Sequence, residues 1–217
     1  MHPSDTVQPI LLRVDKEDPA AHRDAVAAAA LACVLAYARR KTGDAWDEWV
    51  QGRFTKTVRR ASPKAFAKLS AGAPSGKVVV GLAEAAAFEP QRYEDMPRAL
   101  RSLQVSGTQL PAGKPVPAGP GKPLIVLNQD LDMSTGKAAA QAAHALLAWY
   151  LALGTGPAGA YAADSGAAVI EVPGERFREL AAAPEAGPLI VDAGLTEIDP
   201  GSATAFVAAR DLDLSGD

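Results

Sequence analysis

The sequence contains a single cysteine, few aromatic residues and no long hydrophobic run. Cys33 alone excludes an internal disulfide and favours a reducing, cytoplasmic setting. The longest apolar stretch, residues 25–38, is too short and too rich in alanine to span a bilayer. The first ten residues lack the basic start and apolar centre of a signal peptide. The three histidines form no metal-ligand pattern, so we expect a cytoplasmic protein without membrane segment, metal or cofactor.

What the sequence does contain is a linker that divides the 217 residues into two unlike parts. Residues 111–123 read PAGKPVPAGPGKP and alternate Pro and Gly without periodicity. Residues 1–120 hold 17 Lys and Arg against 12 Asp and Glu, a net charge of +5. Residues 121–217 hold 5 against 13, a net charge of −8. We therefore predict two domains, residues 1–110 and 124–217.

Each part repeats one order of elements, which predicts an α/β fold. For the second part we expect strand 124–129, helix 137–151, a Gly/Ala-rich loop to residue 166, strand 167–172, helix 175–182 and strands 189–191 and 203–209. For the first part we expect strand 10–14, helix 22–40, a 46–50 segment, strand 54–60, helix 62–70, strand 77–82 and a last element near 100–106. The repeated order indicates a divergent internal duplication.

A line of polar residues runs down one face of the alanine-rich helix in the second part. Lys137, Gln141 and His144 stand at i, i+4 and i+7. Such a line is either the solvated face of the helix or one side of a site, and His144 by itself is typical of a hydrogen-bonded core histidine. Asp192 ends a short apolar strand in a tight Asp-Ala-Gly turn, where sites of α/β proteins usually form.

Two motifs carry a family resemblance. The first comprises Met133-Ser-Thr-Gly-Lys137 and Ala139-Ala-Gln-Ala-Ala-His-Ala145. The second is Asp192-Ala-Gly-Leu-Thr-Glu-Ile-Asp-Pro-Gly-Ser-Ala-Thr204. In order, spacing and strand context, over residues 122–210, they resemble the type 2 peptidyl-tRNA hydrolases of archaea and eukaryotes. The family motifs read Met-Gly-Lys-Gly-Lys, Ala-Ala-Gln-x-Ala-His-Ala and Asp-Ala-Gly-Arg-Thr-Gln-x-x-Pro-Gly-Ser-x-Thr.

The resemblance implies hydrolysis of the ester between a peptide and the 3′-terminal ribose of tRNA. It implies a catalytic group made of Lys137, Asp192, Thr196 and His144. It implies a substrate-binding group in which Gln141 and Thr204 are polar supports and the N–H groups of Ser134, Thr135 and Gly136 receive the terminal phosphate. The chemistry suits these side chains, because a strand-end carboxylate can activate water and an ammonium can stabilise an oxyanion.

The sequence departs from the family pattern at four motif positions. Ser134 and Thr135 replace Gly and Lys, and Leu195 and Glu197 replace Arg and Gln. Two cations are absent and one acid is added beside a site for a polyanion. The Lys137–Asp192 combination remains, so the changes affect tRNA affinity rather than the core chemistry.

The first part is expected to be a degenerate copy of the family fold. It has no Lys-Gln-His line, and the position of Asp192 falls near Gly81. Because the family commonly works as a dimer, we expect the two units to form a pseudo-dimer within one monomeric chain. Arg59 and Arg60 belong to the densest basic group, which either binds tRNA or forms an ordinary solvated face.

Other functions fit the sequence less well. Asp130-Leu-Asp132 after a strand resembles the nucleophile loop of haloacid-dehalogenase-like phosphatases, but no second acidic pair follows to complete a Mg²⁺ site. Gly136-Lys137 lacks the glycine spacing of a phosphate-binding P-loop. The serious alternative is a catalytically degenerate protein of the same fold that binds tRNA or a protein partner. DNA is not expected as a partner.

Overall fold

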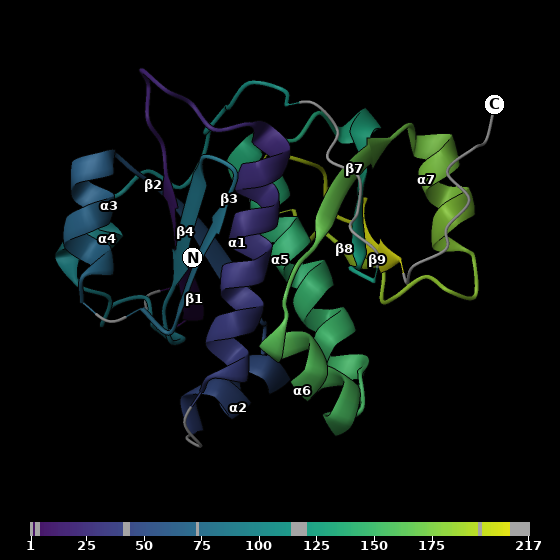
Figure 1. Ribbon diagram of the computed structural model, residues 1–217, viewed down its shortest axis with the longest axis horizontal. Helices are drawn as coiled ribbons and strands as arrows, with labels where there is room; N and C mark the ends of the chain where they lie inside the picture. Colours follow the sequence, from purple (N-terminus) through teal and green to yellow (C-terminus); the bar gives the residue numbers. More distant parts are fainter. Residues whose placement is uncertain are drawn as a thin grey trace.

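The computed structural model describes residues 2, 5–40, 44–72, 74–113, 121–194 and 197–208. They form a mixed α/β fold with two mixed sheets, one from each half of the chain (Figure 1). The α/β class predicted from the sequence is thus confirmed. Residues 114–120 of the linker, residues 195–196 of the second motif and residues 209–217 lie outside the described residues.

The first sheet is built around strand β1 (Thr6–Arg13). Its order is β2-β1-β4-β3, in which β2 (Thr55–Ala61) runs parallel to β1. Strand β4 (Ala83–Ala87) is antiparallel to both β1 and β3 (Gly76–Val80). The two-residue strand β5 (Gln91–Arg92) pairs with the start of β1.

The second sheet has the same order and the same directions. Its order is β7-β6-β9-β8, in which β7 (Ala168–Val172) runs parallel to the central strand β6 (Leu124–Asn128). Strand β9 (Ala203–Ala208) is antiparallel to both β6 and β8 (Ile190–Val191). Strands β1, β2, β3 and β4 therefore occupy the places that β6, β7, β8 and β9 occupy in the other sheet.

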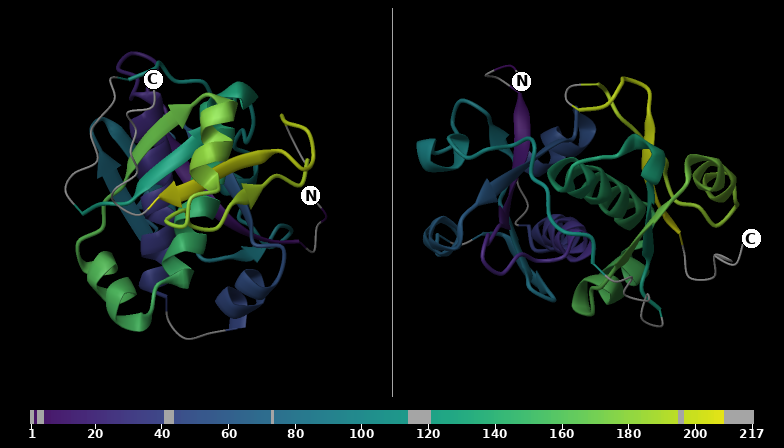
Figure 2. Two further views of the ribbon diagram at one scale, coloured as in Figure 1. Left: turned by 90° about the vertical axis from the view of Figure 1, so that its right-hand side faces the viewer. Right: turned by 90° about the horizontal axis from the view of Figure 1, so that it is seen from above.

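Two long helices lie side by side between the sheets, α1 (His22–Ala38) and α5 (Thr135–Ala152) (Figures 1 and 2). The outer face of the first sheet carries α3 (Pro63–Ser70) and α4 (Arg98–Arg101), and that of the second carries α7 (Gly174–Ala181). The remaining elements are α2 (Asp44–Gln51), α6 (Thr155–Ala163) and the 3₁₀ turn η1 (Gln129–Leu131).

The two central helices run parallel and share one hydrophobic core. At their N-terminal ends, His22 Nδ1 lies 3.0 Å from Thr135 Oγ1. At their C-terminal ends, the rings of Tyr37 and Tyr150 meet edge to face with 6.1 Å between centroids. Most of the buried residues of the two helices between these ends are alanines, so the backbones approach closely. This central core joins the halves, whereas each outer helix layer has a smaller core of its own.

Two sequence-based element assignments were wrong. The predicted loop after α5 contains α6, because its alanines follow Pro157 in the first helical turn, where proline is tolerated. The element expected near residues 100–106, as the counterpart of strand 203–209, is not a strand there; its place in the first sheet is taken by β4, whose sequence AEAAA has low strand propensity. Pairing on both sides, with β1 and β3, holds this segment extended. Residues 100–106 instead contain the end of α4 and one bridge, from Gln104 to Arg60 of β2.

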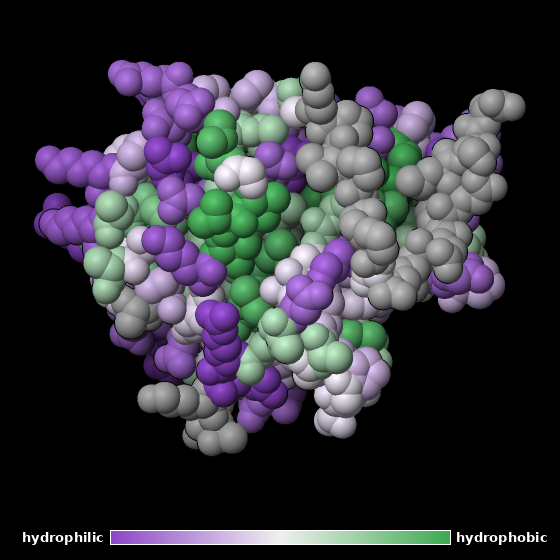
Figure 3. All heavy atoms as spheres, in the orientation of Figure 1, coloured by the Kyte–Doolittle hydropathy of each residue, from purple (hydrophilic) through white to green (hydrophobic). Residues whose placement is uncertain are grey.

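Some apolar surface stays exposed. Figure 3 shows apolar side chains over the region of α1 and β3, surrounded by hydrophilic ones. Val79 and Leu82 of the β3–β4 hairpin are 61% and 54% exposed, and β3 is an edge strand. Within the described residues, no helix has the length and apolar character needed to cross a membrane.

Candidate active site

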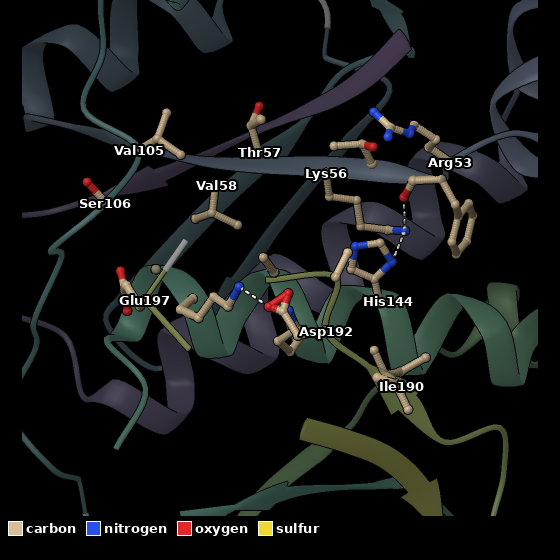
Figure 4. Close-up of a pocket in the computed structure, with 18 of the residues that line it drawn as sticks. Arg53, Lys56, Thr57, Val58, Val105, Ser106, His144, Ile190, Asp192 and Glu197 are labelled. Atoms are coloured by element: carbon tan, nitrogen blue, oxygen red, sulfur yellow. Dashed lines mark hydrogen bonds and ion pairs between the residues drawn. The ribbon is translucent and has the colours of Figure 1, made fainter. Parts of the chain in front are cut away.

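A cleft of about 420 Å³ lies where the two halves meet (Figure 4). Residues 53–58, which include the first part of β2, form one wall. The first turns of α5 and residues 189–193 around β8 form the other. The polar line of α5 faces this cleft, and Lys137 and Gln141 are only 9% and 5% exposed. The line is therefore one side of a cavity and not a solvated helix face.

An ion pair lies in the wall of the cleft. Lys137 Nζ from the first turn of α5 is 2.5 Å from Asp192 Oδ2, which follows β8. The two side chains are 8% and 7% exposed. Because little water reaches them, each charge is stabilised mainly by the opposite charge of its partner. The residues that the sequence singled out as strand-end acid and helix-start base thus meet in the structure.

The turn after β8 fixes the position of Asp192. The Asp192 N–H donates to the Ser202 carbonyl at 2.9 Å, and the Gly201 N–H donates to the Asp192 carbonyl at 2.8 Å. Gly194 has a φ of +73°, and a Cβ there would lie 2.6 Å from Cβ of Pro200. Any side chain at Gly194 would collide with that ring as well as strain the backbone. The Asp-Ala-Gly and Pro-Gly parts of the motif therefore pack against each other and together hold Asp192 in place.

Thr204 and Gln141 connect this turn to the helix. The fully buried Thr204 hydroxyl lies 2.9 Å from Gln141 Oε1 and 3.1 Å from the Ile190 carbonyl oxygen, and shares its proton between these acceptors. Strand β9 is thereby tied to α5 and to the strand that leads into Asp192. Thr204 holds the frame of the site, while Gln141 also lines the cleft; the role of both in binding substrate stays a prediction.

The start of α5 is occupied by groups of the protein itself. Ser134 caps the helix, its Oγ accepting from the Lys137 N–H at 3.3 Å. The Glu197 carboxylate in turn accepts from the Ser134 N–H at 3.2 Å and from its hydroxyl at 2.7 Å. The Gly136 N–H donates to the Thr108 carbonyl at 3.3 Å. A phosphate at this helix start would have to displace Glu197, contrary to our expectation of an open anion site.

Thr135 does not face the cleft either. It is fully buried, and its hydroxyl contacts His22 Nδ1 and accepts from the Leu110 N–H at 3.0 Å. The threonine that stands in place of a family lysine therefore connects the second half to α1 and to the segment that precedes the linker. Its side chain does not reach the cleft, and the role of its backbone N–H in binding a phosphate stays a prediction.

Arg59, which belongs to the basic group predicted to bind tRNA, does not reach the surface. It is fully buried, and its guanidinium donates to the carbonyl oxygens of Leu100, Arg101 and Leu103 at 3.1–3.3 Å. These carbonyls end the short helix α4, so Arg59 caps that helix from within the first half. Arg60, the next residue, is half-buried and bonds the side chain of Gln104.

His144 meets a lysine of the first half at the far end of the cleft. Lys56 Nζ on β2 lies 3.2 Å from His144 Nδ1 (Figure 4). Burial lowers the pKa of His144 well below its usual value, and the neighbouring ammonium groups of Lys56 and Lys137 lower it further. Burial likewise lowers the pKa of Lys56 to about 7. Thr196, expected in the same site, lies outside the described residues.

The sequence model of the family Peptidyl-tRNA hydrolase PTH2 matches residues 122–209. This match supports the PTH2 family for the second half of the chain. It covers the second sheet, α5 and α7, and therefore the Lys137–Asp192 pair. No curated protein and no solved structure matches the chain significantly. For the PTH2-like half, the match supports hydrolase activity in general.

Sequence reasoning did not identify Lys56 as part of the cleft, because it lies outside the PTH2-like half and shares no spacing pattern with its motifs. One signal was present: Trp49 and Phe54 stand close to Lys56 in a basic segment. Sequence reasoning noted Glu197 as an added acid but did not place it. Its bond to Ser134 depends on the return of the chain after Gly194, which no local pattern shows.

Proposed function

We propose that the chain hydrolyses the ester bond between peptide and tRNA in peptidyl-tRNA. The observation that carries this proposal is the Lys137–Asp192 ion pair, which belongs to the part that matches PTH2 and lies in the wall of the cleft between the halves. The carboxylate sits at a strand end and the ammonium in a first helical turn, as the proposed chemistry requires. Lys137, Asp192 and His144 are assigned to catalysis, with Thr196 as a further expected member.

The proposed reaction uses the pair in two roles. Asp192 accepts a proton from a water molecule as that water attacks the ester carbonyl carbon. The Lys137 ammonium orients the carboxylate and stabilises the negative charge that develops on the carbonyl oxygen. The bond from carbon to the ribose oxygen then breaks, and the ribose oxygen takes up the proton. The products are a free peptide carboxylate and a tRNA with an intact 3′ end.

An assay of substrate class tests this proposal. Purified protein is incubated with an N-acetylaminoacyl-tRNA, with the same aminoacyl-tRNA lacking the acetyl group, and with an unrelated carboxylic ester. Preferential release of the N-acetylamino acid is expected. Equal cleavage of all three esters, or no cleavage above the spontaneous rate, would contradict it.

A catalytically degenerate protein of the same fold is the second candidate, and one observation favours it. Glu197 places a carboxylate at the start of α5, beside the cleft that a polyanion would enter. Such a protein would bind tRNA or a protein partner without cleaving the ester. The assay above separates the two candidates, because the degenerate protein should cleave none of the esters above the spontaneous rate.

We also infer that the first half is a silent copy of the PTH2-like half, so that the chain is an internal pseudo-dimer. The shared strand order and the parallel central helices support this inference. Asp24 and Lys137 are each the third residue of their helix, and Gly81 and Asp192 each follow the third strand of their sheet. A Cβ on Gly81 would lie 2.5 Å from Asp24 Oδ2, so these two positions are also neighbours. The first half therefore has Asp24 in the place of Lys137 and Gly81 in the place of Asp192, and it lacks the Lys–Asp ion pair.

Tyr37 and Tyr150 add to this inference. Both stand 15 residues after the start of their helix, and their rings contact each other. His22 and Thr135 are the first residues of the two helices, and they too are in contact. In a two-fold interface, residues near the axis meet their own equivalents. The contacts are of that kind, which explains how a family that works as a dimer could work as one chain.

The basic first half is proposed to bind the tRNA phosphates. Lys64 and Lys68 are exposed on α3, and the Arg53 side chain is 74% exposed at the edge of the cleft. The second half, with its charge of −8, repels a polyanion.

Reversing both lysines of α3, Lys64→Glu with Lys68→Glu, should weaken tRNA binding about tenfold near physiological salt. The slope of log affinity against log salt should flatten by about 0.7–0.9 for each phosphate that the protein no longer neutralises. The double variant Arg176→Glu with Arg178→Glu on α7 changes the charge equally at the opposite end of the molecule and serves as the control (Figure 1). Filter binding across a salt series measures both effects. Equal effects of the two double variants on tRNA affinity would contradict a role of the first half in binding the tRNA phosphates.

Removing the charge of Glu197 should strengthen substrate binding. Glu197→Gln keeps an oxygen that accepts from Ser134 but removes the negative charge at the helix start, where an anion is worth up to about 1–2 kcal/mol. We expect KM for peptidyl-tRNA to fall about three- to tenfold with little change in kcat. Glu185→Gln, at an exposed site away from the cleft, is the control. An unchanged or higher KM for Glu197→Gln would show that the carboxylate does not compete with substrate.

A further inference from the structure

A lysine of the first half is held rigidly at the cleft wall. Lys56 is 6% exposed, and its Nζ donates to the Phe54 carbonyl at 3.3 Å as well as contacting His144. The same nitrogen lies 3.3 Å from the ring centroid of Phe54 and 4.6 Å from that of Trp49. Both rings offer their negative faces to a cation. The amino group is therefore fixed on several sides.

The backbone beside Lys56 is unusual. Phe54 has a φ of +56°, in the left-handed region that a bulky residue seldom adopts. Its carbonyl is the one that holds Lys56, and its ring contacts that of His144 with 5.4 Å between centroids. Strained backbone is retained mainly where the surrounding structure and the function require it. Here it places the aromatic ring and the lysine together against His144.

The contact of Lys56 with His144 determines where the imidazole carries its proton. An ammonium group can only donate, so Nδ1 of His144 must accept. The neutral imidazole then carries its proton on Nε2. Figure 4 shows the ring of His144 with Nδ1 toward Lys56 and the second nitrogen on the side toward Asp192. An N–H donor is thus directed into the cleft.

We propose that Lys56 is a positioning residue for the hydrolytic site: it fixes His144 as the Nε2–H tautomer, which donates to the carbonyl oxygen of the bound ester as negative charge develops there. The kinetic part of this inference rests on the proposed function, whereas the tautomer is a property of the protein alone. The first half, although a silent copy, would then contribute a residue that the site requires.

The tautomer should depend on pH. Below about pH 7 Lys56 is an ammonium and forces Nδ1 to accept; above it a neutral amine can also accept, and the constraint relaxes. Among the described residues, Cys33 on α1 and Lys137 on α5 act electrostatically on this pair. The other charged residues that line the cleft are Arg53, Asp192 and Glu197. The Cys33 thiol stays neutral across this range because burial raises its pKa to about 11. The change near pH 7 is therefore assigned to Lys56.

Nitrogen-15 NMR of the histidine rings tests the proposal on the intact chain. The sequence has three histidines, and His144→Asn identifies the signals of the third. We expect His144 to be the Nε2–H tautomer at pH 6, with a growing Nδ1–H share at pH 9. In Lys56→Met the preference at pH 6 should disappear, whereas the exposed Lys16→Met should keep it. An Nδ1–H tautomer in the wild type at pH 6 would overturn the proposal without any variant being needed.

Kinetics supply a separate readout. Lys56→Met should lower kcat for peptidyl-tRNA about tenfold and leave KM within a factor of two, because the hydrogen bond that it removes strengthens only as charge develops. Lys16→Met should change neither. A tautomer that stays fixed in Lys56→Met, or an effect seen only in KM, would contradict the positioning role. If no protein turns over the substrate while the tautomer results hold, the proposed function fails and the assignment of Lys56 to His144 stands.

Discussion

Replacing Asp192 by Asn should lower turnover of peptidyl-tRNA at least about 100-fold. The amide has the shape of the carboxylate but cannot take a proton from water, and loss of a positioned general base typically costs about 10²–10⁴-fold. Lys137→Met should have an effect of similar size, because the oxyanion loses its ammonium and Asp192 loses the group that orients it. Initial rates of N-acetylaminoacyl-tRNA hydrolysis measure both effects. A loss of only two- or threefold in either variant would show that other residues carry the reaction.

Stability must be separated from catalysis in these variants. Each single change leaves one charge of a buried pair without its partner, which destabilises a protein by up to about 3–5 kcal/mol when the pair is fully buried. The combination Lys137→Met with Asp192→Asn removes both charges and should recover most of that stability without recovering turnover. Thermal unfolding followed by circular dichroism is the measurement. An active double variant would contradict the assigned roles.

Replacing Ala143 by Leu should disturb the junction between the halves. Ala143 is fully buried in the central core on α5, and its carbonyl oxygen lies 3.8 Å from Cys33 Sγ of α1, so three more carbons would have to displace core side chains. Overpacking of this kind costs about 1–3 kcal/mol. Because a protein of this size loses about 2–4 °C in Tm per kcal/mol, we expect Tm to fall by roughly 2–12 °C.

The exposed Ala160→Leu on α6 is the matched control and should leave Tm within about 1–2 °C. Activity should fall together with Tm in Ala143→Leu, since α5 also carries Lys137 and His144 into the cleft. An unchanged Tm in that variant would mean that α1 and α5 can move apart without loss of stability, which would contradict a single core shared by the two helices.

The elements that sequence reasoning predicted best are those with strong local signals. Apolar strands such as β6, the capped helix α3 and the alanine-rich helices α1 and α5 were expected where they lie. Strand β4 was not, because its alanines favour a helix and only its neighbours keep it extended. Local propensity therefore predicted the order of most elements, but it did not predict a strand such as β4 that is extended only because it pairs with its neighbours.

In the site, sequence reasoning failed mainly for residues whose role depends on contacts between the two halves. The approach of Lys137 to Asp192 was predictable, since both stand at element ends on one edge of one sheet and match family motifs. The burial of Thr135 and the position of Lys56 depend on contacts with the other half, to His22 and His144. Arg59 shows the same limit within one half, because a buried and an exposed arginine look alike in sequence. Tertiary contacts, and not residue type, decide these roles.

The most direct measurement for the central claim is the single-turnover rate of N-acetylaminoacyl-tRNA hydrolysis, with protein in excess, for wild type and Asp192→Asn at equal tRNA occupancy. Because both proteins keep the basic first half, they should bind tRNA within a few-fold of each other. We predict rapid release of N-acetylamino acid by the wild type and a rate at least about 100-fold lower for Asp192→Asn. Equal rates for the two proteins, or tRNA binding by the wild type with no release above the spontaneous rate, would contradict an active Lys137–Asp192 site.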